Sequence, residues 1–222
     1  MEIAIVLYDR FTALDAIGPY EVLSRLPGAE LYFVAAAPGP VMTDNGMLTV
    51  EAERGIRDAE RPDIIVVPGG PGEVPVRAGG EVLEWLARVH ETSTWTTSVC
   101  TGSLILAAAG LLDGVRATTH WLAREQLERL GAHVVPDRVV FEGKIVTAAG
   151  VSAGIDMGLA LAAKVAGDTV AQAIQLGIEY DPQPPFDSGA PEKAPPEVVE
   201  LLRSRSRHIG ETPDAAGTPT TA

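Results

Sequence analysis

Short strand-like runs alternate with helical segments over most of the 222 residues, and this alternation restricts the fold more than any other feature of the sequence. Residues 3–8 and 63–67 are nearly uninterrupted apolar runs, which is typical of parallel strands buried on both faces. Residues 81–90 carry apolar side chains at helical spacing. Strands that alternate with helices form βαβ units around a mainly parallel sheet. We therefore predict an α/β fold, a flavodoxin-like three-layer sandwich with a mainly parallel central sheet.

The other elements follow from turn residues and periodicity. Further helices are predicted at residues 14–26, 102–112, 121–130 and 153–165. Further strands are predicted at 30–37, 94–99 and 117–119, and hairpins are predicted to turn at 44–46 and 142–143. Residues 181–196 contain many prolines and are expected to form an extended surface segment. We predict one domain over residues 1–208 and a disordered tail over 209–222, because the end of the chain is rich in Thr, Pro, Ala and Gly.

The formal net charge of −13 argues against partners that are themselves anionic, so we expect no nucleic-acid or membrane-surface binding. One cysteine forms no internal disulfide, and the four histidines have no metal-site spacing, so no metal is expected. The first residues lack a basic region and a cleavage signal, and no apolar run reaches the length of a membrane helix. We therefore expect a cytoplasmic location.

The only cysteine, Cys100, follows the predicted strand 94–99 and precedes a helix of small apolar residues. A strand that turns sharply into a helix is the geometry of a nucleophile elbow, and Gly102 fits the close packing of such a turn. The helix N-terminus favours a thiolate at this position. A lone cysteine is often a small core residue instead. We interpret Cys100 as a nucleophile because core cysteines are more common in the middle of an element.

A glycine-rich turn at 68–72 follows another predicted parallel strand. In open α/β sheets, ligands bind outside the carboxyl ends of such strands. Backbone N–H groups of Gly70 and Thr101 are therefore candidate donors to a developing anion. An ordinary glycine turn is the alternative. The turn matches neither a dinucleotide-binding nor a P-loop pattern.

Asp15 follows the first strand, which places it at the same edge of the sheet as Cys100. Thr12 and Asp15 also have capping-box spacing, so Asp15 is alternatively a helix-start carboxylate. Glu21 lies deeper in the same helix and is a weaker candidate. His120 is a candidate base, or a structural histidine.

The stretches at 14–19, 97–112, 117–121, 150–156 and 179–186 resemble the ThiJ/PfpI superfamily, whose fold is related to class I glutamine amidotransferases. The resemblance runs from the first strand to about residue 186. Many members place His after the cysteine or Glu on the first helix, whereas this chain has Thr101 and Asp15. That combination resembles the isonitrile hydratase branch rather than the peptidase-like and deglycase-like branches. The Cys-Thr-Gly-Ser pattern also occurs in an amidase-like domain of some AraC-type regulators, but no DNA-binding module is expected here.

The resemblance implies cysteine-dependent hydration of a small-molecule isonitrile to an N-substituted formamide, a hydro-lyase reaction that needs no cofactor. It implies Cys100 as nucleophile, Asp15 as proton donor and acceptor, and Gly70 and Thr101 as groups that position the substrate. It further implies a homodimer. Three alternatives stay open: a thiol-based redox sensor or stress protein, a ligand-binding module of the same fold, and another thiol-dependent hydrolase or glyoxalase.

Overall fold

The computed structural model describes residues 1–205 and has a seven-stranded central sheet. In spatial order its strands are β10 (Val139–Glu142), β11 (Ile145–Ala148), β7 (Trp95–Val99), β6 (Ile64–Val67), β1 (Glu2–Val6), β2 (Glu30–Ala35) and β5 (Arg54–Gly55). Every neighbouring pair is parallel except the β10–β11 hairpin. The predicted mainly parallel sheet is thus confirmed.

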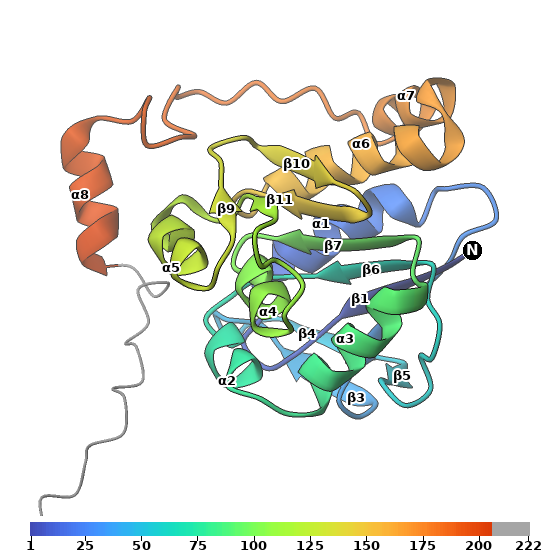
Figure 1. Ribbon diagram of the computed structural model, residues 1–222. Helices are drawn as coiled ribbons and strands as arrows, with labels where there is room; N and C mark the ends of the chain where they lie inside the picture. The colour runs from blue at the N-terminus through green and yellow to red at the C-terminus, as the bar shows by residue number, and fades with distance from the viewer. Residues whose placement is uncertain (206–222) are drawn as a thin grey trace, which may run out of the picture.

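Helices cover both faces of this sheet (Figure 1). One layer contains α1 (Ala13–Leu23), α6 (Ala153–Ala166) and α7 (Asp168–Gly177). The other contains α2 (Glu73–Arg77), α3 (Glu81–Thr92), α4 (Gly102–Ala108) and α5 (Arg124–Arg129), which is preceded by a short 3₁₀ turn, η1 (Trp121–Ala123). The last described helix, α8 (Pro196–Arg205), lies at the periphery. The three-layer α/β prediction is confirmed.

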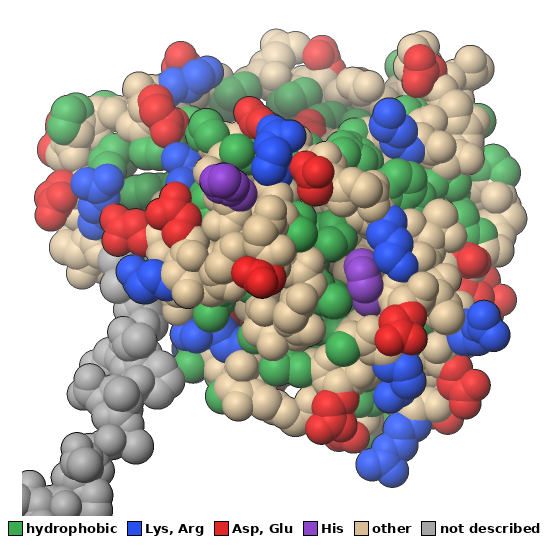
Figure 2. Space-filling view, viewed as in Figure 1, with side chains coloured by type: hydrophobic (Ala, Val, Ile, Leu, Met, Phe, Trp, Pro, Cys, Tyr) green, Lys and Arg blue, Asp and Glu red, His purple; other side chains and the backbone are tan. Residues whose placement is uncertain are grey.

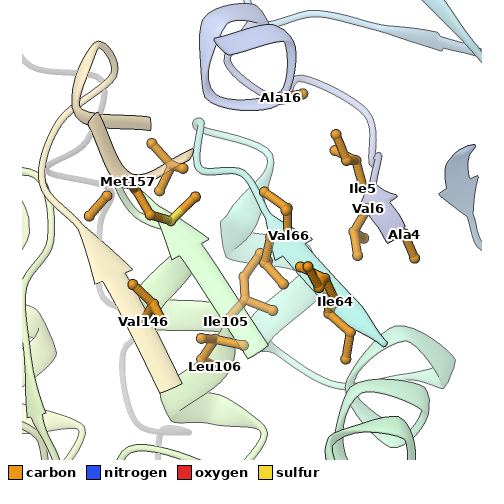
Figure 3. Packing of buried hydrophobic residues seen from close by; sticks show 14 of the residues in the cluster. Ala4, Ile5, Val6, Ala16, Ile64, Val66, Ile105, Leu106, Val146 and Met157 are labelled. Atoms are coloured by element: carbon orange, nitrogen blue, oxygen red, sulfur yellow. The ribbon is translucent and has the colours of Figure 1, made fainter. Parts of the chain in front are cut away.

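The core forms where strand side chains meet the two helical layers (Figure 3). Ile64 and Val66 of the central strand β6 have no exposed surface. Ile105 on α4 and Met157 on α6 are also fully buried, one from each helical layer. Burial on both faces explains why the central strands have apolar residues at successive positions instead of alternating with polar ones.

Two smaller sheets complete the fold. The hairpin predicted around 44–46 is confirmed as β3 (Gly39–Met42) and β4 (Thr49–Ala52), which pair antiparallel. The strand predicted at 117–119 is shorter, because β8 (Arg116–Ala117) pairs with β9 (His133–Val134) outside the central sheet. The predicted strand is therefore present, but it is shorter than predicted and belongs to a separate two-stranded sheet.

Other differences concern element ends and weakly patterned segments. Helix α4 ends at Ala108, four residues before the predicted end at 112, since Gly110 has a φ of 78° that suits a chain reversal. Helices α2, α7 and α8 and strands β5 and β9 were not predicted. The predicted tail at 209–222, and the last residues of the domain predicted over 1–208, lie outside the described residues.

The connections around β1 and β6 determine where a ligand can bind. From β1 the chain crosses through α1 to β2 on one side, whereas β6 leads through α2 and α3 to β7 on the other side. Crossovers that leave in opposite directions open a crevice at the carboxyl ends of the two strands. Asp15, Gly70 and Cys100 come after β1, β6 and β7, so they converge at this edge.

The surface mixes acidic and basic side chains over the face in Figure 2 instead of gathering the excess negative charge in one patch. No helix within residues 1–205 is long and apolar enough to cross a membrane. The candidate site is therefore the crevice at the carboxyl ends of the parallel strands.

Candidate active site

Cys100 occupies the turn between β7 and α4 with a φ of 57°. A residue with a side chain rarely adopts this left-handed region, so the turn is strained, as the predicted nucleophile elbow requires. Hydrogen bonds hold the turn: Ser103 Oγ and Thr119 Oγ1 donate to the Cys100 carbonyl oxygen at 3.1 and 2.9 Å. A Cβ at Gly102 would lie 2.1 Å from the Val67 carbonyl oxygen, so only glycine fits there. The local geometry predicted for the Cys100 turn is present.

The Cys100 thiol is completely buried, and burial raises its pKa well above the ordinary value. The negative charge of Asp15 raises the pKa further. The backbone N–H groups of Val151 and Thr101 act in the opposite direction, but their effect is smaller. The sequence-based expectation that the start of α4 favours a thiolate therefore identified a real contribution but not the net result. Burial and the charge of Asp15 therefore favour the protonated thiol.

Asp15 lies in the first turn of α1 and is also completely buried. Its Oδ2 accepts a hydrogen bond of 2.9 Å from the Gly69 N–H. Burial raises its pKa to about 7, while the Gly69 N–H and hydrogen bonding with the Cys100 thiol favour the carboxylate. The Oδ1 atom has no partner of standard hydrogen-bond geometry within the described part of the chain. Asp15 is thus a buried carboxyl group beside the thiol that titrates near neutral pH.

The capping-box alternative for Asp15 receives no support, because Thr12 makes no side-chain cap hydrogen bond to α1. The Thr12 hydroxyl instead donates to Asp44 Oδ2 at 3.2 Å. The side chain of Asp15 turns inward toward Gly69 and Cys100. Its burial in the crevice distinguishes it from an ordinary helix-start carboxylate.

Thr101 and Gly70 meet, but not in the predicted arrangement. The Gly70 N–H donates to Thr101 Oγ1 at 2.9 Å, so this N–H does not face an empty oxyanion position. The Thr101 N–H acts on the Cys100 sulfur. We expected both N–H groups to face the substrate. Instead, the Gly70 N–H is bonded to Thr101 Oγ1, and the Thr101 N–H interacts with the Cys100 thiol. A hydroxyl oxygen that already accepts from Gly70 directs its own proton elsewhere.

Sequence reasoning did not predict roles for Gly69 and Val151. A Cβ on Gly69 would lie 2.5 Å from the Thr101 nitrogen and 3.0 Å from Asp15 Oδ2, so glycine is required between the acid and the helix start. Val151 follows β11 with a φ of 26°, and its N–H acts on the thiol. Val151 lies at the carboxyl end of the strand next to β7, and this position is the signal that could have identified it.

The two weaker candidates, Glu21 and His120, have different surroundings. Glu21 is exposed and pairs with Arg25 one helical turn later. The Nδ1 of His120 accepts a hydrogen bond of 3.3 Å from the Leu122 N–H. The ring of His120 lies against Gly150, where an added Cβ would come within 2.7 Å of its Cδ2 atom.

A cavity of about 370 Å³ opens next to the elbow. Its walls come from His120 and the α5 region, from Arg138, from residues 149–152 after β11, and from residues 189–192 of the C-terminal segment. Val151 belongs both to this wall and to the surroundings of the thiol. Since Cys100 itself has no exposed surface, a substrate in the cavity reaches the sulfur only after neighbouring atoms move.

No group of three or more His, Cys, Asp or Glu side chains within residues 1–205 is arranged to hold a metal ion. What the site offers is a protonated thiol, an acid that titrates near 7, and a hydroxyl oriented by a backbone amide. These groups can form a covalent bond to an electrophilic carbon and move protons to and from it.

Comparison with known proteins gives a consistent picture. The model of the DJ-1/PfpI family matches residues 1–164. The isonitrile hydratase of Pseudomonas putida is 42% identical over 206 residues, which cover 93% of this chain and 90% of that protein. A solved ThiJ/PfpI family protein from Pseudomonas syringae aligns with a TM-score of 0.89 and 37% identity, covering 91% of this chain and 84% of the other.

A more distant relative has a different kind of name. The HTH-type transcriptional regulator CdhR of Pseudomonas aeruginosa is 34% identical over 173 residues. The match covers 75% of this chain but only 50% of the regulator. Proteins with different roles therefore share this fold.

Proposed function

Because the chain belongs to the DJ-1/PfpI family, we propose that it is an enzyme that hydrates isonitriles to N-substituted formamides through a covalent bond to Cys100. The observation that carries the proposal is the buried pair of Asp15 and Cys100 at a strained turn. The identity to the Pseudomonas putida isonitrile hydratase, 42% over 93% of this chain, supports the substrate class.

In the first step, Asp15 takes the thiol proton and the sulfur forms a bond to the terminal carbon of R–N≡C. The proton then passes from Asp15 to that carbon, which gives the thioimidate R–N=CH–S–Cys100. A carboxyl group with a pKa of about 7 is suited to this exchange, because it accepts and returns a proton at neutral pH with little cost.

In the second step, Asp15 removes a proton from water, the water oxygen bonds to the thioimidate carbon, and Asp15 passes that proton to the nitrogen. The carbon–sulfur bond then breaks, the sulfur recovers the hydroxyl proton, and R–NH–CHO leaves. The sum is the addition of one water, so the reaction needs no metal or organic cofactor. In this proposal the Thr101 hydroxyl, whose oxygen accepts from the Gly70 N–H, donates a hydrogen bond to the changing nitrogen or oxygen.

The backbone N–H groups of Thr101 and Val151 have a separate part in this scheme. Both favour the charged form of the sulfur. They lower the free energy of the thiolate when it forms in the first step and when the carbon–sulfur bond breaks in the second. This matters because the sulfur is buried and water does not solvate it. Gly70 is therefore a positioning residue in the proposal, whereas Thr101 touches the reacting atoms.

The direct test is incubation with an aryl isonitrile while formamide is followed by chromatography. Wild-type protein should produce formamide, and Cys100→Ala should lose at least about 10³-fold in kcat/KM, because no other side chain replaces the nucleophile. Mass spectrometry of acid-quenched protein should show an adduct at Cys100. Formamide production that survives Cys100→Ala would contradict the proposal.

The alternative of a redox sensor has no specific observation in its favour, since thiol oxidation requires thiolate character and exposure, and Cys100 has neither at rest. A ligand-binding module would bind isonitriles without releasing formamide in the same assay. The homodimer and the cytoplasmic location remain part of the proposal, and sedimentation of the purified chain tests the first.

A further inference from the structure

The wall of the cavity beside the elbow contains charged side chains that the hydration chemistry does not require. Arg124 and Arg138 both line it. Arg138 is occupied by its neighbours, since its Nε pairs with Asp156 and its Nη2 donates to Ser152 Oγ at 3.1 Å. Arg124 differs, because its Nε is buried and finds no hydrogen-bond partner anywhere in residues 1–205. A charged group with a buried donor left over is the feature to be explained.

The one ion pair of the Arg124 side chain within residues 1–205 is with a carboxylate, which indicates the kind of group that it binds. Its Nη1 lies 3.3 Å from Glu192 Oε1. Glu192 belongs to the segment 181–195, here called the strap, which runs from α7 to α8 (Figure 1). The Glu192 side chain is 64% exposed, whereas that of Arg124 is 27% exposed. A mostly solvated carboxylate thus reaches one donor of a mostly buried guanidinium and leaves another donor unused.

We propose that Arg124 binds a carboxylate on the R group of the substrate, so that the preferred substrates are isonitriles that carry a carboxylate. This inference rests on the proposed function and names its substrate class. The planar guanidinium fork matches a carboxylate in two parallel hydrogen bonds, which a single contact from Glu192 does not supply. The carboxylate of Glu192 occupies the position in the absence of substrate and is displaced by it.

The position of the cavity fits this assignment. Arg124 and Val151 line the same space, and Val151 also contacts the thiol through its N–H. A substrate held at Arg124 by its carboxylate therefore extends toward the wall behind which Cys100 lies. A volume of about 370 Å³ holds a small substituted ring or a short chain.

The experiment compares two substrates that differ in one charge, 4-isocyanobenzoate and its methyl ester. Wild-type kcat/KM should favour the carboxylate by about 10- to 100-fold, the range expected for a charge-assisted hydrogen-bonded pair. Arg124→Gln should bring the ratio of the two values close to one. Arg129→Gln is the matched control, because Arg129 lies on the same helix with 65% of its side chain exposed, so it should keep the wild-type ratio.

A binding measurement separates this inference from the proposed function. Calorimetry with the product 4-formamidobenzoate needs no turnover. Binding that is lost in Arg124→Gln, retained in Arg129→Gln and tightened in Glu192→Gln supports the carboxylate site even if no isonitrile is hydrated. Equal kcat/KM for acid and ester in the wild type, or product binding unaffected by Arg124→Gln, would overturn it, and the Arg124–Glu192 pair would then only fasten the strap.

Discussion

The first turns of α1 and α2 each hold a buried carboxyl group, and burial raises the pKa of both to about 7. Asp15 faces a thiol and a backbone amide. Glu73 faces Arg77 one turn later, with 2.7 Å between Oε2 and Nε, although the contact lacks hydrogen-bond geometry. Both lie near the buried Tyr8, whose pKa their charges raise. The same shift thus accompanies the proposed proton-transfer group in one turn and an ion pair in the other.

What differs is the fate of the charge. Ionised Glu73 has a cation opposite it, so the cost of burying its carboxylate is partly offset without any ligand. Within residues 1–205 no cation is paired with ionised Asp15, and its charge makes the neighbouring thiol harder to ionise. A raised pKa therefore marks a reactive site only when the partner is itself reactive.

The strongest way to break this comparison is to neutralise each acid and measure turnover. Asp15→Asn should lower kcat by about 10²- to 10⁴-fold, because the proton exchange with Cys100 is lost. Glu73→Gln should keep kcat within roughly threefold, measured well below its unfolding temperature. Equal losses of kcat in the two variants would mean that Asp15 and Glu73 have the same role in turnover.

The pH dependence of the free energy of unfolding also distinguishes Asp15 from Glu73, with a smaller expected effect than turnover. Each acid has a folded-state pKa of about 7 and an unfolded value of about 4. Between these values the folded chain binds a proton that the unfolded chain does not, so the free energy of unfolding falls as pH rises from about 4 to about 7. The stabilisation is fully present below pH 4 and absent above pH 7.

Asp15→Asn should remove about 2 kcal/mol or more of that fall, and its stability at pH 8 should exceed that of the wild type. Glu73→Gln should remove a smaller part of the fall, because the charge of Arg77 lowers the pKa of Glu73 and offsets part of the effect of burial. Urea unfolding at several pH values measures both. A wild-type-like pH slope in Asp15→Asn would show that the acid is already ionised at pH 4.

Much of the Asp15 region could be predicted from sequence, whereas the Glu73 region could not. Asp15 follows the apolar run at residues 3–8, and Cys100 follows the strand Trp95–Val99, which is rich in β-branched residues. Parallel strands bring their carboxyl ends together whatever the side chains. Thr101 followed from its place beside Cys100. Glu73 lies in a helix of five residues after a glycine-rich turn, where no periodicity develops.

The contacts that adjust the site depend on tertiary packing. The Gly69 N–H meets Asp15 over 54 residues of sequence, and the Gly70 N–H meets Thr101 over 31. No local pattern determines which of two adjacent glycine amides meets which side chain. The net rise in the thiol pKa was likewise missed, because the sequence shows the helix start but not the depth of burial.

The backbone at Cys100 gives the smallest predicted effect. No comparable strain is found at Glu73, whereas Cys100 has a φ of 57°. Cys100→Gly should therefore be more stable than Cys100→Ala by about 1 kcal/mol, the reverse of the order in an ordinary helix, since glycine adopts this conformation freely. Thermal unfolding of the two variants checks the order, and a more stable alanine variant would show that the turn relaxes.

The absent side chain at Gly102 limits how this scaffold can be redesigned. Because the Val67 carbonyl oxygen would lie only 2.1 Å from any added Cβ, the start of α4 and the end of β6 fit together as one inseparable block. A mutant library that varies this block should yield mostly inactive clones. Randomising the strap and the cavity walls other than Val151 instead leaves the Cys100 turn in place, so new specificities are best sought there.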